Sequence, residues 1–265
     1  MMYHLALLAP KGGIGKSLSC IELASGFGKR GYRTLLMDMD CQGSATFACG
    51  LDIEDPNLKT LKNVLDGENI KTVICHNTPY GDIVPNNLKL FTADQMYSPQ
   101  IGAMRKVSKA LESIKEDYDF VIFDCPPSFG FTTLSALVAS DYIIVPQLAS
   151  MFSMISIRQL ETICTLIKEN ENPELKVLGV FLTKYNPRTR FSKDLENNLK
   201  KFSKELLDAP VFDTKIRNAI AVEESIAAKT NIFDYAPGTK IAEDFNSLIE
   251  EILSKLNIPA IKEAE

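Results

Sequence analysis

A strand-like run, Tyr3–Ala9, leads directly into the glycine-rich segment Pro10-Lys11-Gly12-Gly13-Ile14-Gly15-Lys16-Ser17. A helical pattern follows over Lys16–Arg30. A glycine-rich turn between a strand and a helix lets consecutive backbone N–H groups converge on phosphate oxygens, aided by the positive end of the helix dipole. The segment therefore predicts a phosphate-binding loop within an α/β fold.

Two side chains of this loop have specific expected tasks. Lys16 would reach the β- and γ-phosphates of a nucleotide, and the Ser17 hydroxyl would coordinate Mg²⁺. The general motif GxxxxGK[ST] is altered here, because Pro10 stands at the first glycine and Lys11 adds a second lysine. The competing interpretations are an accidental glycine turn and, for Lys11, a solvated loop lysine. The residues expected to bind the nucleotide are Lys11, Gly12, Gly13, Ile14, Gly15, Lys16, Ser17 and Leu18.

Outward from the loop, short β-rich runs alternate with longer helical patterns, which is typical of βαβ units around a parallel sheet. The predicted strands are Tyr3–Ala9, Thr34–Met39, Lys89–Thr92, Phe120–Asp124, Tyr142–Pro146 and Val177–Thr183. The predicted helices are Lys16–Arg30, Tyr97–Asp117, Ser153–Asn170, Ser192–Leu207 and Lys240–Leu256. We expect one α/β domain over residues 1–265, with a doubly wound, mostly parallel sheet flanked by helices.

Composition excludes several classes of protein. The 265 residues carry a formal net charge of −5 and are 45% hydrophobic, as in ordinary globular proteins. There is no apolar stretch of about 20 residues and no signal-peptide pattern, so we expect a cytoplasmic protein. The six cysteines form no CxxC pair and only two histidines could assist a metal, which favours reduced thiols over a zinc or iron–sulfur site.

Carboxylates stand where the predicted strands end. Asp38 and Asp40 follow the second strand, and Asp124 ends the run Phe120–Asp124. The carboxyl ends of such strands form the functional edge of this kind of sheet. We expect Asp40 to orient the attacking water in phosphoryl transfer, and Ser17, Asp40 and Asp124 to serve Mg²⁺. Asp38 either supports the Mg²⁺ shell or packs structurally, and a strand-terminal aspartate capping a turn is the alternative for Asp124.

The pattern Lys-Gly-Gly-x-Gly-Lys-Ser resembles the deviant Walker A box of the ParA/MinD family, in particular its ParA/Soj-type chromosome and plasmid partition ATPases. The segment from Asp38 to Thr46 is similar to the family's switch I, and the run ending in Asp124 resembles Walker B. The resemblance implies a P-loop NTPase that uses ATP and Mg²⁺, with Lys11, Lys16 and Asp40 as catalytic residues. It further implies an ATP-dependent sandwich homodimer in which Lys11 contacts the partner subunit's phosphates.

The resemblance extends over nearly the whole chain, with some departures. The chain begins at the first strand, like the short ParA proteins without an N-terminal helix-turn-helix extension. Cys41 replaces a proline of switch I, and Leu18 replaces a second hydroxyl residue near the α-phosphate. Ser150 and Ile220 replace a glutamate and an arginine, which affects the expected dimer and DNA contacts.

Charge is distributed unevenly along this acidic chain. Residues 176–240 hold 12 Lys+Arg against 8 Asp+Glu. A local basic face can bind DNA phosphates without reading sequence, and a solvated helix face is the alternative. The family resemblance implies nonspecific binding of double-stranded DNA by the ATP-bound dimer at the nucleoid, and a ParB-type partner that stimulates a slow ATPase. The favoured DNA contacts are Arg188, Arg217, Lys229 and Lys240.

Alternative functions remain at this point. A related ATPase could position another cargo, such as a microcompartment or a chemoreceptor cluster, on the nucleoid. A MinD-like membrane switch needs a basic amphipathic C-terminal helix, whereas residues 241–265 hold two lysines against six acidic residues, so we expect no membrane partner. A nitrogenase-type reductase needs cysteines that bridge an iron–sulfur cluster between subunits. Cys125 directly follows Asp124, but no suitably placed second cysteine accompanies it, which argues against this class. A metabolic kinase needs an acceptor pocket for which the sequence offers no candidate.

Overall fold

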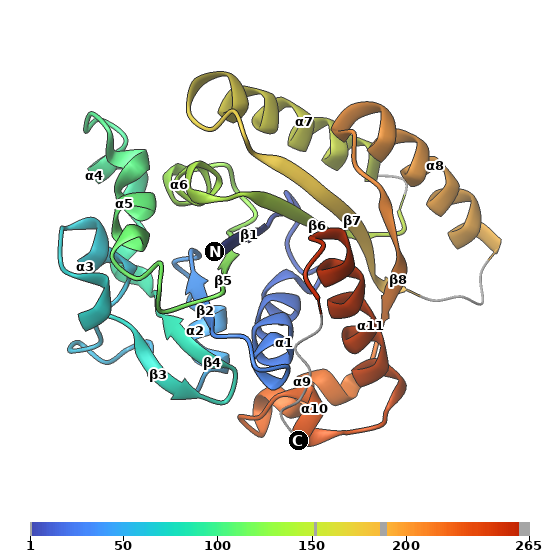
Figure 1. Cartoon of the computed structure of the whole chain (residues 1–265), viewed down its shortest axis with the longest axis horizontal. Helices are drawn as coiled ribbons and strands as arrows, with labels where there is room; N and C mark the ends of the chain where they lie inside the picture. Colours follow the sequence, from blue (N-terminus) through green and yellow to red (C-terminus); the bar gives the residue numbers. More distant parts are fainter. Residues whose placement is uncertain (1, 151–152, 186–189, 260–265) are drawn as a thin grey trace.

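The computed structural model describes residues 2–150, 153–185 and 190–259. Its strands form one sheet of eight with the order β3-β4-β2-β5-β1-β6-β7-β8 (Figure 1). All neighbouring pairs are parallel except β3 and β4, which form an antiparallel hairpin at one edge. The strands are β1 Tyr3–Leu7, β2 Thr34–Asp38, β3 Cys75–Thr78, β4 Gly81–Val84, β5 Phe120–Asp124, β6 Tyr142–Leu148, β7 Lys176–Tyr185 and β8 Val211–Arg217.

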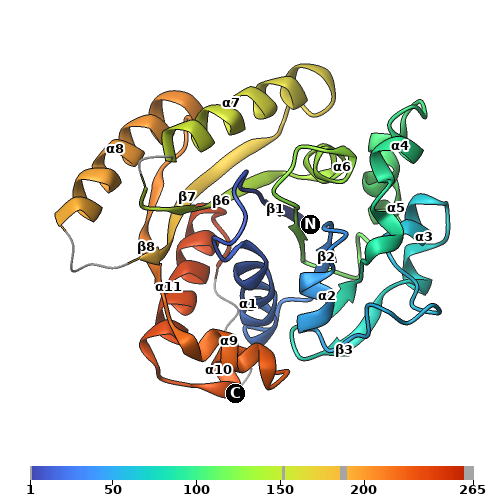
Figure 2. The same cartoon turned by 180° about the vertical axis from the view of Figure 1, so that it is seen from behind.

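Helices cover both faces of this sheet, as Figures 1 and 2 show from opposite sides. The helices are α1 Lys16–Lys29, α2 Ser44–Ala48, α3 Leu61–Leu65, α4 Ala93–Tyr97, α5 Lys106–Glu112, α6 Phe131–Ala139, α7 Ser153–Asn170, α8 Arg190–Leu207, α9 Ile220–Ala227, α10 Ile232–Tyr235 and α11 Lys240–Lys255. Short 3₁₀ turns lie at Ile70–Thr72, Leu88–Leu90 and Ala103–Arg105. In the described part of the chain, no helix is both long enough and apolar enough to cross a bilayer.

The two faces have separate apolar cores. Successive residues of β1 alternate between them, with Ala6 in the core under α5–α8 and Leu5 and Leu7 in the core under α1 and α11. Helices α1 and α11 approach closely at Gly26, where a Cβ atom would stand 2.1 Å from Ile249 Cδ1. The predicted doubly wound α/β fold is therefore confirmed.

The strand order brings the predicted carboxylates together. Strand β5 lies between β2 and β1, and Asp124 stands in register with Asp38 on one side and Leu7 on the other. From β1 the chain passes to β2, which lies on one side of β1. From β5 it passes to β6, which lies on the other side of β1. Such a reversal opens a crevice at the carboxyl ends of the strands. The glycine-rich loop after β1 lies at this crevice.

Two predicted elements are wrong. Lys89–Thr92 is not a strand, because the Asn87 side chain accepts the Lys89 N–H and closes a 3₁₀ turn. The sheet instead ends on this side with the hairpin of β3 and β4, in which β3 is the edge strand. The single helix predicted over Tyr97–Asp117 is divided, because Pro99 interrupts it and Gly102 has a left-handed φ of 73°. Only α5 remains as a regular helix within that range.

Strand β8 was not predicted. Among the residues that the structure describes, its outer edge pairs with no further strand of the sheet, and α11 caps part of this edge. The backbone N–H groups of Asp213 and Thr214 both donate to the Glu251 carboxylate, at 3.0 Å each. An acidic side chain that takes these donors satisfies them and discourages pairing with a further strand. The acidic face of α11 therefore has a structural task at the edge of the sheet.

Candidate functional site

The glycine-rich loop adopts a conformation that its glycines allow. Gly13 and Gly15 have φ values of 73° and 88°, in the left-handed region that other residues rarely adopt. Helix α1 begins at Lys16 directly after the loop, with no acidic residue in its first turn. The first backbone N–H groups of a helix have no partner within it, and they carry the positive end of its dipole. The loop and helix therefore form a binding site for an anion.

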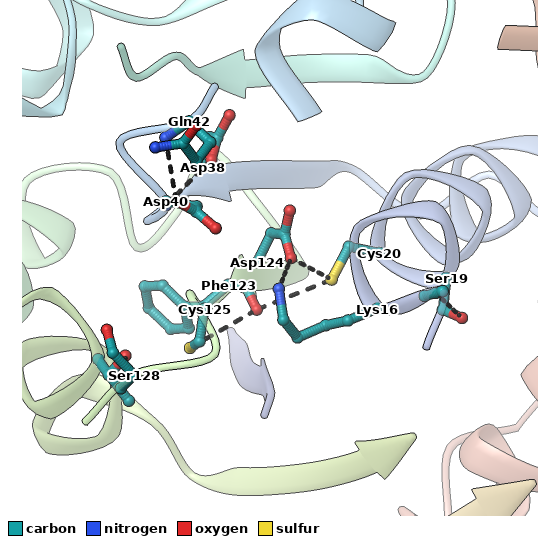
Figure 3. A network of polar contacts seen from close by, with 12 residues as sticks. Lys16, Ser19, Cys20, Asp38, Asp40, Gln42, Phe123, Asp124, Cys125 and Ser128 are labelled. Atoms are coloured by element: carbon teal, nitrogen blue, oxygen red, sulfur yellow. Dashed lines mark hydrogen bonds and ion pairs between the residues drawn. The ribbon is translucent and has the colours of Figure 1, made fainter. Parts of the chain in front are cut away.

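Lys16 and Asp124 form a buried ion pair at the base of the loop (Figure 3). Lys16 Nζ donates to Asp124 Oδ1 at 2.8 Å, and the two side chains are 7% and 0% exposed. Burial alone would lower the pKa of Lys16, but the Asp124 carboxylate outweighs it and holds the pKa above its usual range. The Cys20 thiol also points at Asp124 Oδ1, with 3.6 Å between the two atoms. Burial raises the pKa of this thiol, so it stays protonated.

Asp38 has a structural partner in switch I. Its Oδ2 accepts the backbone N–H and the hydroxyl of Thr46 at 2.9 and 2.7 Å, and its Oδ1 accepts the Asp40 N–H at 3.1 Å. Burial, followed by the charge of Asp124, raises the pKa of Asp38 to about 7. These contacts support the packing alternative for Asp38, because it fixes α2 and the backbone of Asp40.

Asp40 lies at the wall of a cavity of about 590 Å³, within the usual size range of small-molecule sites. Its Oδ1 accepts the Gln42 N–H at 3.0 Å (Figure 3). The cavity brings together seven of the eight predicted loop residues and Asp40; it is also lined by switch I residues and by Pro127. The eighth, Ile14, is buried and lines a smaller neighbouring cavity of about 40 Å³ with Thr183 and Asn218.

The arrangement of oxygen atoms fits Mg²⁺. Asp124 Oδ2 is buried and accepts no hydrogen bond from any residue that the structure describes. Ser17 lines the cavity beside Lys16, and Asp40 lies across it on switch I. Mg²⁺ prefers one or two carboxylates together with phosphate oxygens over a cage of protein ligands. Within the described ranges, no group of three or more His, Cys, Asp or Glu side chains could hold a metal by itself.

The predicted DNA contacts have different environments. The guanidinium of Arg217 makes a bidentate pair with Asp244, at 2.6 and 2.7 Å, which holds the pKa of Arg217 above its usual range. Lys229 follows α9 and Lys240 begins α11, and both side chains are exposed. Arg188 lies outside the described residues. The structure therefore leaves this set as a prediction, with Lys229 and Lys240 more accessible than Arg217.

Sequence reasoning did not anticipate one contact to the loop. Lys184, which the charge count placed in the basic region, donates from Nζ to the Gly13 carbonyl at 2.9 Å. These residues are 171 positions apart in the chain. Motif spacing carries no signal for such a contact, because it depends on the order of strands in the sheet.

Comparison with known proteins agrees with this geometry. Residues 2–177 match the family model described as AAA domain. The chain is 32% identical to the cell division protein PomZ of Myxococcus xanthus, over 93% of this chain and 76% of that one. It is 29% identical to the sporulation initiation inhibitor protein Soj of Bacillus subtilis, over 94% of this chain and 97% of Soj.

A solved structure extends the similarity to the fold. Cobyrinic acid a,c-diamide synthase from Mycobacterium smegmatis, with bound ATP analog and magnesium, superposes with a TM-score of 0.83. The two proteins are 25% identical, and the match covers 99% of this chain and 100% of the synthase. From the altered phosphate loop, the fold and these similarities, we conclude that the chain belongs to the AAA-domain family and, within it, to the ParA/Soj-type ATPases of the ParA/MinD family.

Proposed function

We propose that this protein is an ATP-driven positioning switch: it dimerises around ATP, binds DNA without sequence preference in that state, and releases it on hydrolysis. The main support is the Lys16–Asp124 ion pair, which lies beside a cavity that Lys16 and Asp40 both line. The second carboxylate oxygen of Asp124, Oδ2, has no hydrogen-bond partner among the described residues. ATP and Mg²⁺ are the cofactors, as in the related synthase structure. The arrangement provides a cation for phosphate, oxygen atoms for Mg²⁺ and a carboxylate for water.

Each residue of the site has a defined task in hydrolysis. The loop N–H groups orient the phosphates, and Lys16 leaves Asp124 Oδ1 to neutralise charge on the β- and γ-phosphates. Asp124 and Ser17 would hold Mg²⁺, which would neutralise negative charge on the phosphates when bound. Asp40, placed by its own bond to Gln42 and by Asp38, positions the attacking water. Lys11 lines the cavity and reaches the phosphates bound to the second subunit.

DNA binding follows from dimerisation in this proposal. One subunit presents few phosphate contacts, whereas two subunits double the number and make binding strong enough to depend on ATP. Lys229 and Lys240 are the most accessible of the proposed contacts that the structure describes. A ParB-type partner stimulates a slow ATPase, and the protein works in the cytoplasm on the nucleoid. Similar proteins are named for cell division and for chromosome partitioning, so a plasmid, a chromosome or another cargo fits the proposal.

The test is binding to random-sequence duplex DNA with ADP, with ATP, and with ATP plus an Asp40→Ala variant, across a salt series. We expect binding only with ATP, binding that persists in the variant, and a steep loss of affinity with salt. Asp52→Ala, at an exposed aspartate in the loop after switch I, is the matched control and should hydrolyse ATP normally. ATP-dependent dimers that never bind DNA would overturn the DNA step.

A membrane switch is the second candidate, and α11 argues against it. An interfacial helix inserts an apolar face into the lipid. The apolar face of α11, including Phe245, Leu248 and Ile252, is buried against the sheet instead. Its outer side holds Glu243 and Glu250, which anionic lipid would repel. We expect no sedimentation with anionic vesicles in either nucleotide state.

A further inference from the structure

A lysine outside the motifs contacts the phosphate loop. Strand β7 ends beside the glycine-rich loop, and Lys184, its penultimate residue, reaches back to Gly13. The Nζ–O distance of 2.9 Å is that of a charge-assisted hydrogen bond. None of the roles assigned to the phosphate loop, switch I or Asp124 uses this lysine.

The backbone of Lys184 is held in an unusual conformation. Its φ is 49°, in the left-handed region that costs a non-glycine residue about 1 kcal/mol or more. Its neighbours are fixed by their own contacts: the Thr183 hydroxyl donates to the Gln147 carbonyl at 3.4 Å, and Lys215 Nζ lies 4.8 Å from the centre of the Tyr185 ring. The end of β7 is therefore a supported position from which the lysine side chain crosses to the loop.

The bond to Gly13 determines how one peptide group of the loop is oriented. A trans peptide is planar, and its C=O and N–H point in opposite directions. Lys184 holds the Gly13 carbonyl on its own side of the loop, so the N–H of Ile14, which belongs to the same peptide group, points to the opposite side. This peptide rotates about ψ of Gly13 and φ of Ile14, and Gly13, which has no side chain and a left-handed φ, restricts its own torsion little.

From this geometry we propose that Lys184 is a positioning residue for nucleotide binding: it orients the Gly13–Ile14 peptide so that its N–H is available to the phosphates. The inference rests on the proposed ATP site and deepens it. It also gives Lys184 a different task from the DNA contact that its place in the basic region suggested. Lys184 lines the smaller cavity together with Gly15, Leu18 and Asn218, so it lies beside the loop.

The experiment compares Lys184→Met with Lys184→Arg and with a matched control, Lys176→Met, an exposed lysine at the other end of the same strand. Affinities for Mg-ADP and for adenosine are measured by calorimetry or competition. Since the bond acts on a phosphate-binding N–H, we expect Lys184→Met to weaken Mg-ADP roughly ten-fold and to leave adenosine unchanged. Lys184→Arg should recover part of the loss, and Lys176→Met should behave like wild type.

A general loss of structure would have a different signature. Lys184 is exposed, so the melting temperature of Lys184→Met without nucleotide should stay close to that of the wild type. Equal weakening of Mg-ADP and adenosine, or no rescue by arginine together with a lower melting temperature, would overturn the positioning role. Unchanged Mg-ADP affinity with weaker DNA binding would assign Lys184 to the DNA face instead. Wild-type protein that binds no nucleotide would overturn the proposed function itself, and this role with it.

Discussion

Lys16 Nζ and Asp124 Oδ1 are 2.8 Å apart, and each is the charge that compensates the other in a buried site. The pair joins the start of α1 to the end of β5, two segments that both border the phosphate loop. In the proposed mechanism, nucleotide binding replaces the Asp124 contact of Lys16 with phosphate contacts. Without a nucleotide, each of the two buried charges depends on the other for compensation.

Removing only one member of this pair should be costly. We expect Lys16→Met to reduce the free energy of unfolding by about 3–5 kcal/mol, because it leaves the Asp124 carboxylate buried without its cation. The double variant Lys16→Met with Asp124→Asn should recover much of the loss. Urea denaturation gives both values. Lys29→Met is the control, since Lys29 and Asp234 are both largely exposed and their pair is worth at most about 1 kcal/mol.

A second buried carboxylate makes stability depend on pH. Burial, with a smaller contribution from the charge of Asp234, raises the pKa of Glu22 from its ordinary 4.5 to about 8, although the Ile232 N–H that its carboxylate accepts acts in the opposite direction. Between these values the folded protein binds more protons at Glu22 than the unfolded chain does, so stability falls as pH rises through this window.

Glu22→Gln should therefore increase stability at high pH. The glutamine oxygen can still accept the Ile232 N–H, and no charge has to be buried. We expect the melting temperature of the variant to exceed that of the wild type clearly at pH 9 and only slightly at pH 5. Glu174→Gln, at an exposed position, should show no such difference. Parallel melting curves for wild type and Glu22→Gln across this range would contradict the assignment.

The Asp94 carboxylate caps the start of helix α6 and packs closely against Gly130. The Asp94 carboxylate accepts the Phe131 N–H at the start of α6, and a Cβ atom on Gly130 would lie 2.7 Å from Asp94 Oδ2. Gly130→Ala should displace this carboxylate and cost about 1 kcal/mol, the typical value of a lost helix cap. Gly28→Ala is the control, because its Cβ meets nothing within 4 Å. If the cost comes from the cap, Gly130→Ala should be nearly neutral in an Asp94→Ala background.

The sequence predicted the parts of the fold whose signals are local. The apolar runs of β1, β2 and β5 and the glycine-rich loop were readable in the sequence. Strands covered by helices on both faces are continuously apolar, and a phosphate loop has a recognisable spacing of glycines and lysine. Strand β8 was missed because Asp213, Thr214 and Lys215 make it polar, as its position at the sheet edge requires. The sequence left two roles open for Asp38 and did not predict the contact of Lys184, because each depends on a partner that the fold supplies.

The salt dependence of DNA binding distinguishes the proposed DNA contacts from one another. Each lysine that contacts a phosphate adds about 0.9 to the magnitude of the slope of log K against log salt. In an ATP-bound dimer, Lys240→Ala or Lys229→Ala removes two contacts and should lower this magnitude by about 2. Arg217→Ala should change the slope less and lower the melting temperature more, because Asp244 already neutralises its charge and would lose its partner. Lys115→Ala, at an exposed position in the turn after α5, is the control and should leave the slope unchanged. Equal slopes for wild type, Lys229→Ala and Lys240→Ala would place the DNA on another face of the dimer.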